Sequence, residues 1–276
     1  MIAHYKDNSN NCCYYFFMIK YPEIDPVFLK LGPLEFRWYG LAYVLGLFLP
    51  FILFKKDFET RFQMFAEDRS NLMIFLMIGI IIGGRLGYVI FYDPINYISN
   101  PFGILMLNKG GMSYHGGAVG AMLAVIFYAS RYKKPTFLLL DLLGLFSTIG
   151  IGLGRLANFI NGELYGRVSS VAWAMVFPRG GHLPRHPSQL YEAFFEGLVL
   201  FLILFYLLKK HSLKPGQLFA VYIFLYGIFR FFIEFTREPD PQIGLFFGLF
   251  SMGQLLCLLW IVIGSSLFFF FKKKTL

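Results

Sequence analysis

The chain has 276 residues, of which 57% are hydrophobic, 20% aromatic and only 15% charged, and its formal net charge is +9. Soluble domains carry about a quarter charged residues, so this composition argues against a soluble protein. The positive charge does not indicate nucleic acid, because lysines and arginines stand in short runs between apolar stretches, as at Lys55–Lys56 and Lys209–Lys210. The sequence contains no zinc-type spacing of cysteine and histidine and no Walker or dinucleotide-binding motif, so we expect neither a metal nor another cofactor.

The apolar runs predict an all-α polytopic membrane protein with about seven transmembrane helices, since several runs approach the roughly 20 residues that cross a bilayer. In chain order the runs are Trp38–Phe54, Leu72–Phe91, Gly111–Ser130, Thr136–Ile160, Ser188–Leu208, Gly216–Phe235 and Ile243–Phe271. The last run is long enough to begin with a re-entrant or interfacial piece before Gly253. We expect no signal peptide, because Tyr14–Ile19 is too short for its apolar core.

Basic residues in the connections predict the orientation. The loops after the first, third and fifth runs and the C-terminal tail hold lysines and arginines in short, dense segments, whereas the N-terminal segment and the other loops spread theirs more thinly. The N-terminus is therefore predicted outside and the C-terminus in the cytoplasm. Inside the runs the basic residues are Arg85, Arg155 and Arg230, all in the outer half of the membrane.

Polar residues within the runs gather on the same outer side. A charged side chain at the centre of a bilayer costs about 2.5–3.5 kcal/mol on insertion scales, so each such residue needs a reason. The outer half also holds Tyr39, His115, Glu192 and Glu196. Only Asp141 lies near an inner end. This one-sided cluster indicates a site open to the outer leaflet rather than an ion pathway, and the arginines suit a phosphate-bearing lipid headgroup.

His115 stands in a glycine-rich segment, residues 110–118. A neutral imidazole there could take a proton near neutral pH. It could equally bridge helices above a glycine packing face. The segment alone leaves both interpretations open.

The segment Gly154–Arg167 carries the densest polar motif. Arg155 and Asn158 are three residues apart and share a helix face. The helix is then expected to break at Asn161, and Glu163 follows at the membrane surface. The same groups could simply stabilise a helix end through an amide and an ion pair, but so many polar residues among glycines favour a functional site.

Two further motifs pair charges on helices. Arg230 and Glu234 are four residues apart, with Tyr226 one turn earlier on the same face. Such a pair makes two membrane charges tolerable, and it can also orient an arginine towards a phosphate.

The segment His186–Glu192 is expected to open a helix, with Ser188 as its cap. Glu192 and Glu196 share a face, either as ligands for the arginines or as catalytic groups.

Together these segments resemble the prolipoprotein diacylglyceryl transferase family, from about Tyr21 to the last run. The most specific part is Gly154–Arg167. The other matching parts are Trp38–Gly40, Tyr114–Gly117, His186–Glu192, Arg230–Glu234 and Arg237–Asp240. Ala157 and Tyr165 depart from the family's commoner glycine and tryptophan. Residues 1–17 have no counterpart in the family, so we expect a variable extension there and a single integral-membrane transferase domain over residues 18–276.

The resemblance implies a multi-pass enzyme of the bacterial cytoplasmic (inner) membrane that needs no cofactor. Its donor is phosphatidylglycerol from the bilayer, its acceptor is the lipobox cysteine of a preprolipoprotein, and its products are a thioether-linked lipid and glycerol phosphate. The implied catalytic residues are His115, Arg155 and Arg230. The implied substrate-binding residues are Tyr39, Arg155, Asn158, Glu163, Gly166, Arg230 and Glu234, to which we add Tyr226 from its place beside Arg230.

In the implied reaction a thiolate displaces phosphate from the glycerol carbon. We expect His115 to take the thiol proton. Arg155 and Arg230 are expected to neutralise the leaving phosphate.

Two carboxylates are expected to hold arginines in place. Glu234 would hold Arg230, and Glu163 would orient Arg155 or Arg167.

Two other classes of protein would also fit parts of the sequence. A small-molecule transporter would have several spans and buried charges, but it would form no lipid product. A structural or assembly protein would have glycine-rich helix faces, but it would tolerate substitution of His115 or Arg155.

Overall fold

The computed structural model describes residues 2–6, 13–17, 19–106, 110–210, 213–238 and 250–273. The chain divides into two compact units, one formed by residues 1–46 and 144–276 and the other by residues 47–143. Two helices, α1 and α6, cross the boundaries between the units.

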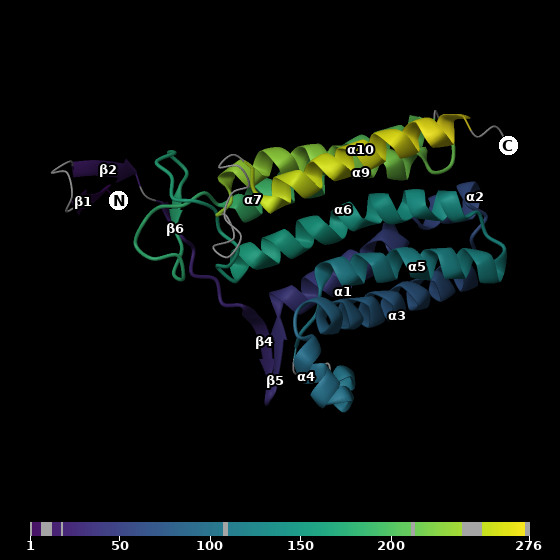
Figure 1. The fold of residues 1–276 in the computed structure, drawn as a ribbon, viewed down its shortest axis with the longest axis horizontal. Coiled ribbons are helices and arrows are strands. Elements are labelled where there is room, and N and C mark those ends of the chain that lie inside the picture. Colours follow the sequence, from purple (N-terminus) through teal and green to yellow (C-terminus); the bar gives the residue numbers. More distant parts are fainter. Residues whose placement is uncertain are drawn as a thin grey trace. The chain divides into compact units, whose positions relative to one another are not determined.

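The first unit combines small strand pairs with long helices (Figure 1). Its strands are β1 (Ile2–Lys6), β2 (Cys13–Phe17), β3 (Ile19–Lys20), β4 (Val27–Leu31), β5 (Leu34–Arg37) and β6 (Met175–Val176). Its helices are α1 (Trp38–Leu53), α6 (Thr136–Ile160), α7 (Ser188–Glu192), the π-helix η3 (Ala193–Val199), α8 (Leu200–Lys210), α9 (Gln217–Ile233), the 3-10 turn η4 (Glu234–Thr236) and α10 (Met252–Lys273). The pairs β1–β2 and β4–β5 are antiparallel, and β3 runs parallel to β6.

The second unit is helical over the residues that the structure describes. It holds α2 (Lys55–Arg61), α3 (Ala66–Phe91), α4 (Pro94–Ser99), the 3-10 helix η1 (Pro101–Leu105) and α5 (Tyr114–Tyr132).

Within the residues that the structure describes, five helices are long and apolar enough to cross a membrane. They are Ala66–Phe91, Thr136–Ile160, Ser188–Lys210, Gln217–Thr236 and Met252–Lys273. The helix Trp38–Leu53 is apolar but shorter. The sequence prediction of a mostly helical protein with several apolar spans is confirmed, while the number seven and the orientation stay predictions. The suggested piece before Gly253 falls largely on residues 239–249, outside the described part of the chain.

Glycines allow α3 and α5 to lie side by side in the second unit (Figure 1). A Cβ atom added to Gly79 would lie 2.5 Å from the carbonyl oxygen of Gly120. One added to Gly87 would lie 2.7 Å from the Cα of Gly116. No larger residue fits at this contact, which is the small-residue packing typical of membrane helices. The glycines around His115 therefore have a packing role whatever the histidine does.

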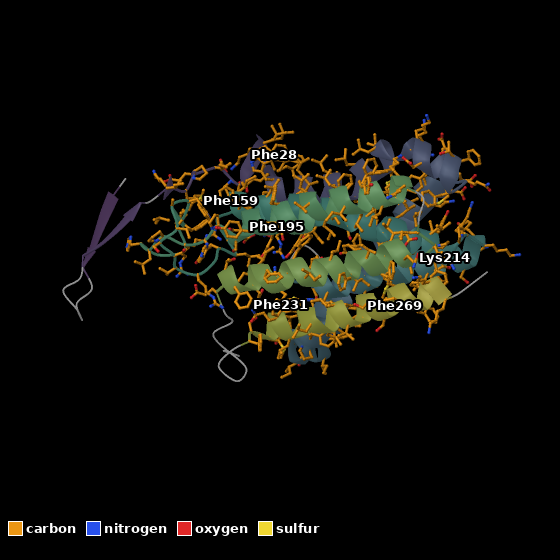
Figure 2. All side chains as sticks on the ribbon, turned by 90° about the horizontal axis from the view of Figure 1, so that it is seen from above. Phe28, Phe159, Phe195, Lys214, Phe231 and Phe269 are labelled. Atoms are coloured by element: carbon orange, nitrogen blue, oxygen red, sulfur yellow. The ribbon has the colours of Figure 1, made fainter. Side chains whose placement is uncertain are left out.

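The helices α9 and α10 form a second close pair, in the first unit. A Cβ at Gly264 would lie 2.6 Å from the backbone nitrogen of Phe224, so this pair also depends on a glycine. In Figure 2, Phe231 lies toward one end of the pair, and Lys214 lies with Phe269 toward the other. The Nζ of Lys214 donates to the carbonyl of Lys272 at 2.9 Å, which joins the start of α9 to the end of α10.

The contact that positions the candidate site is between α6 and η3. A Cβ at Gly197 would lie 2.6 Å from the Cα of Gly152, so the two backbones touch. The helix that began as α7 widens into a π-helix at this contact. π-Helical turns inside α-helices are often found at functional sites, and two buried glutamates, Glu192 and Glu196, precede Gly197 on this helix.

Candidate active site

Glu192 is the centre of the polar cluster in the first unit. Its side chain is fully buried, and three arginines from different segments meet on it. Arg155 Nε from α6 lies 2.6 Å from Oε2, and Arg230 Nη1 from α9 lies 2.8 Å from Oε1. Arg237 Nη1, from the segment after α9, lies 2.6 Å from the same Oε1. The carboxylate thus joins α6, α7 and the end of α9.

Two more glutamates surround this arginine cluster, which we define as Arg155, Arg230 and Arg237. Glu234 Oε2 lies 3.2 Å from Arg230 Nη2 and 3.6 Å from Arg237 Nε. Glu196 Oε1 lies 3.6 Å from Arg230 Nη1. Neither oxygen of Glu196 has a hydrogen-bond partner among the described residues. The expected pairing of Glu234 with Arg230 is therefore present, and both glutamates of the α7–η3 helix act as arginine ligands.

The arginines of the cluster are more exposed than the glutamates that hold them. The side chains of the arginine cluster keep 16–21% of their surface exposed, whereas those of Glu192 and Glu196 keep 0%. The carboxylates hold the arginines from inside, and part of each arginine side chain remains exposed. Guanidinium groups suit phosphate because their donors form a rigid fork. Removing one partner of such a buried pair costs about 3–5 kcal/mol, since the other charge stays buried.

A second polar group lies where α6 ends. The Nδ2 atoms of Asn158 and Asn161 donate to Glu163 Oε1 at 2.9 and 3.3 Å. The expectation that Glu163 orients Arg155 or Arg167 is wrong in this structure. The carboxylate of Glu163 accepts from these two amides instead, in a turn where the chain reverses at Gly162, whose φ is +63°.

The turn after α6 is fixed to the start of α7. Gln189 Nε2 donates to the carbonyl of Glu163 at 2.6 Å, and Ser188 Oγ donates to the carbonyl of Leu164 at 3.0 Å. Ser188 was expected to cap its helix. Instead Pro187 occupies the cap position without a side-chain hydrogen bond, because the serine hydroxyl is used by the turn.

Gly166 connects the turn to the arginine cluster. Its backbone nitrogen donates to the carbonyl of His186 at 2.8 Å, and the nitrogen of Arg167 donates to the carbonyl of Thr236 at 2.8 Å. A Cβ at Gly166 would lie 2.9 Å from His186 Cβ and would collide with the Thr236 carbonyl. Only glycine fits here, so Gly166 places the segment that carries Arg237. This accounts for Gly166 without a direct contact to substrate.

A hydrogen-bonded chain of three side chains lies next to Glu192. Trp173 Nε1 donates to the hydroxyl of Tyr191 at 2.5 Å, and that hydroxyl lies 3.1 Å from His186 Nδ1. Burial lowers the pKa of His186, because the charged imidazolium loses solvation. His186 is therefore held as a neutral group at the start of the α7 helix.

Three further predicted site residues make contacts of a different kind. Tyr43 donates its hydroxyl to the Tyr39 hydroxyl at 3.2 Å near the start of α1. The ring of Tyr226 on α9 lies 6.0 Å from that of Tyr222. His115 is exposed at the second position of α5, with its ring edge-on to Tyr114. His115 belongs to the second unit, so its association with the arginine cluster stays a prediction.

Arg85 differs from the other two arginines predicted inside the membrane. It is only 3% exposed and donates to five carbonyls, those of Gly103, Ile104, Met106, Gly110 and Gly111. Its guanidinium also lies 5.1 Å from the ring centre of Tyr97. These contacts fix the loop between α3 and α5. The suggestion that all three membrane arginines serve a headgroup is therefore wrong for Arg85, whose donors are already used.

Arg237 is the site residue that reasoning about burial cost missed. It lies beyond the end of the sixth predicted span, so a membrane insertion penalty did not single it out. Its motif, Arg237–Asp240, was noted only through the family resemblance.

Among the described residues no group of His, Cys, Asp and Glu side chains is arranged to hold a metal ion.

Comparison with known proteins gives the same family as the motifs. The family model for prolipoprotein diacylglyceryl transferase matches residues 26–270. A phosphatidylglycerol–prolipoprotein diacylglyceryl transferase of Geobacter sulfurreducens is 48% identical over 251 residues, which cover 90% of this chain and 96% of that protein. Proteins of the same name from Pseudomonas aeruginosa and Bordetella bronchiseptica are 46% and 44% identical, over 91% and 92% of this chain and 94% and 97% of their own. None of these names describes a transporter.

Proposed function

The chain belongs to the prolipoprotein diacylglyceryl transferase family, and we propose that it transfers the diacylglyceryl group of phosphatidylglycerol to the lipobox cysteine of a preprolipoprotein. The products are a thioether-linked lipid on the cysteine and free glycerol phosphate. This reaction is the first step of bacterial lipoprotein maturation. Apolar helices long enough to cross a bilayer support access to a lipid donor.

The reaction is a substitution at the glycerol carbon that carries the phosphate. The acceptor sulfur forms a carbon–sulfur bond as the carbon–oxygen bond to phosphate breaks, and the leaving glycerol phosphate keeps that electron pair. The thiol proton passes to a base. The protein therefore has two tasks, to take this proton and to stabilise the growing charge on the phosphate oxygens.

We assign the second task to the arginine cluster. This proposal is carried by a single observation, the convergence of Arg155, Arg230 and Arg237 on the buried Glu192. The carboxylate fixes the three guanidinium groups before the substrate arrives, so little reorganisation accompanies the reaction. The three arginine side chains each keep an exposed part, and we expect the phosphate to approach there. Glu234 supports the same arrangement by pairing with two of the three.

We assign the thiol proton to His115. It is exposed at the N-terminal turn of α5, where a substrate can reach it. Ser113 accepts from the backbone nitrogen of Gly116 at 3.2 Å and so caps this helix. The alternative role, in which His115 only positions the acceptor, predicts a different pH dependence.

The remaining predicted residues have supporting roles in this proposal. Asn158 and Glu163 fix the turn at the end of α6, next to Arg155. Gly166 places the segment of Arg237, and Tyr226 lies one turn from Arg230 on α9. Tyr39 stands at the start of α1. The family supports an inner-membrane location, and the basic residues of the loops support a cluster that faces the outer leaflet. Reporter fusions after Lys210 and after Asp240 should therefore report the cytoplasm and the exterior respectively.

The direct test of the function uses purified protein, phosphatidylglycerol and a synthetic lipobox peptide. The peptide should gain the mass of one diacylglyceryl group, and glycerol phosphate should appear in equal amount. A peptide whose cysteine is replaced by serine is the control and should stay unmodified. No mass gain on the cysteine peptide from folded protein would refute the proposal.

A further inference from the structure

An apolar groove lies between α6 and the helix that runs through α7, η3 and α8. Its volume is about 440 Å³, within the range of about 300–1,000 Å³ that holds small ligands. Leu153 and Leu156 line one wall, and Phe194 and Leu198 line the other. Thr148 also lines it, but its hydroxyl donates to the carbonyl of Leu145 at 2.7 Å. The groove therefore offers an apolar ligand nothing but hydrocarbon surface.

The groove exists because two glycine backbones touch beside it. The Cβ of any residue at position 197 would lie 2.6 Å from the Cα of Gly152, so neither helix carries a side chain at the contact. The larger side chains on both sides stay half exposed. Leu156 is 44% exposed, and Phe194 and Leu198 are each 51% exposed. These three side chains are free to contact a molecule lying in the groove.

One end of the groove adjoins the arginine cluster. Leu156 directly follows Arg155 on α6, and Leu190 lies two residues before Glu192 on α7. The ion pair of Arg155 with Glu192, at 2.6 Å, joins the same two helices at this end. A phosphate on the cluster would therefore have the groove next to it. From Leu190 to Phe201 the groove follows the helix for roughly 16 Å, at about 1.5 Å per residue.

We propose that this groove binds one acyl chain of the phosphatidylglycerol donor while the phosphate of that donor lies on the arginine cluster. The inference rests on the proposed function and names a part of its substrate site. An acyl chain is the expected occupant because the groove is apolar and one end lies next to cationic groups, which matches a lipid with an anionic headgroup. The acyl chain leaves bilayer hydrocarbon rather than water, so the groove favours it by the packing contacts along its walls, and a chain too short to follow the groove loses these contacts.

The preference can be measured with two donors, phosphatidylglycerols with chains of sixteen and of eight carbons. The variants Leu153→Trp and Leu198→Trp place a large side chain in the groove. In each, the ratio of kcat/KM for the long donor to that for the short donor should fall by tenfold or more. Val262→Trp is the matched control, because Val262 is 61% exposed on α10 and does not line the groove, and its ratio should stay that of the parent.

Photocrosslinking of the unmodified protein gives a second measurement, which does not depend on the folding of a variant. A phosphatidylglycerol with a diazirine near one chain end should label residues of the groove, and unmodified phosphatidylglycerol should compete. Label spread equally over exposed lipid faces, such as those of Ile78 and Val262, would mean bulk lipid only and would overturn the proposal. Unchanged selectivity in two folded groove variants would overturn it too. If the parent transfers neither donor, the proposed function itself fails.

Discussion

Arg237 Nη1 lies 2.6 Å from Glu192 Oε1, although 45 positions separate the two residues in the sequence. The same oxygen lies 2.8 Å from Arg230 Nη1. An arginine of the segment after α9 thus shares one buried oxygen with an arginine of the membrane helix. The relationship makes Glu192 the residue on which the arrangement of the whole arginine cluster depends.

Replacing Glu192 should disturb the positions of all three arginines, even where the new side chain is nearly the same size. Glu192→Gln leaves three guanidinium groups without their common charge, and we expect a loss of about 3–5 kcal/mol of stability with little remaining transfer. Glu192→Asp keeps the charge and should recover part of both. The measurements are the melting temperature in detergent and the rate of transfer to a lipobox peptide.

The control is Glu23→Gln. Glu23 pairs with Lys20 at 3.0 Å, and the two side chains are 69% and 79% exposed, so the change should cost about 0–1 kcal/mol. Equal effects of the Glu23 and Glu192 variants would contradict a central role for Glu192.

Gly166→Ala should separate the turn after α6 from the segment that carries Arg237. The added Cβ would lie 2.9 Å from His186 Cβ and would collide with the Thr236 carbonyl, so the two segments must move apart. We expect transfer to fall by at least tenfold. Gly150→Ala is the control, because a Cβ there meets nothing within 4 Å. A Gly166→Ala enzyme as active as the Gly150→Ala enzyme would show that this contact does not place Arg237 for the reaction.

The positions of the helices could be predicted from the sequence because crossing a bilayer demands long apolar runs. Thr136–Ile160 was predicted to the residue, and the other predicted runs overlap helices of the described part of the chain, although α3 begins at Ala66 rather than at Leu72. The π-helix η3 could not be predicted, because its apolar pattern does not distinguish a π-helical turn from an α-helix; in the structure it coincides with the contact of Gly152 with Gly197.

The candidate site was predictable only in part. The cost of placing charge in a membrane singled out Arg155 and Arg230, and both lie in the cluster. The same rule also selected Arg85, which satisfies its donors with carbonyls of its own loop. It passed over Arg237, which lies outside the apolar runs. Which polar groups meet is decided by tertiary packing, which the spacing of residues along the sequence does not reveal.

His115→Asn should slow transfer most at low and neutral pH. Asparagine is close in size to histidine but cannot act as a base, and the acceptor thiol ionises unaided only near its ordinary pKa of about 8.5. Raising the pH from 7 to 9 should therefore recover part of the rate of the variant relative to the parent. The measurement is a pH profile of kcat/KM for both proteins. An equal deficit at every pH would assign His115 a positioning role.

The buried His186 should make the protein less stable in acid. Its pKa in the folded state lies below the ordinary value of 6.5, so the unfolded chain takes up a proton first as the pH falls. The stability contributed by neutral His186 is complete above pH 6.5 and is lost as the pH falls towards the folded pKa. His186→Gln removes this proton and should flatten the decline of melting temperature between pH 7 and 5. Parallel curves for variant and parent would exclude His186 as a cause.

The central claim, that the arginine cluster stabilises the departing phosphate, is tested most directly by changing the leaving group. Arg230→Gln should lower transfer from phosphatidylglycerol by roughly 10²–10³, the loss typical of one preorganised donor. In a donor with a sulfonate ester in place of the phosphate, the sulfonate leaving group needs little stabilisation by a cationic side chain. With that donor we predict that the deficit of Arg230→Gln, measured as a ratio of kcat values in folded protein, shrinks to less than about tenfold. An equal deficit with both donors would contradict the account.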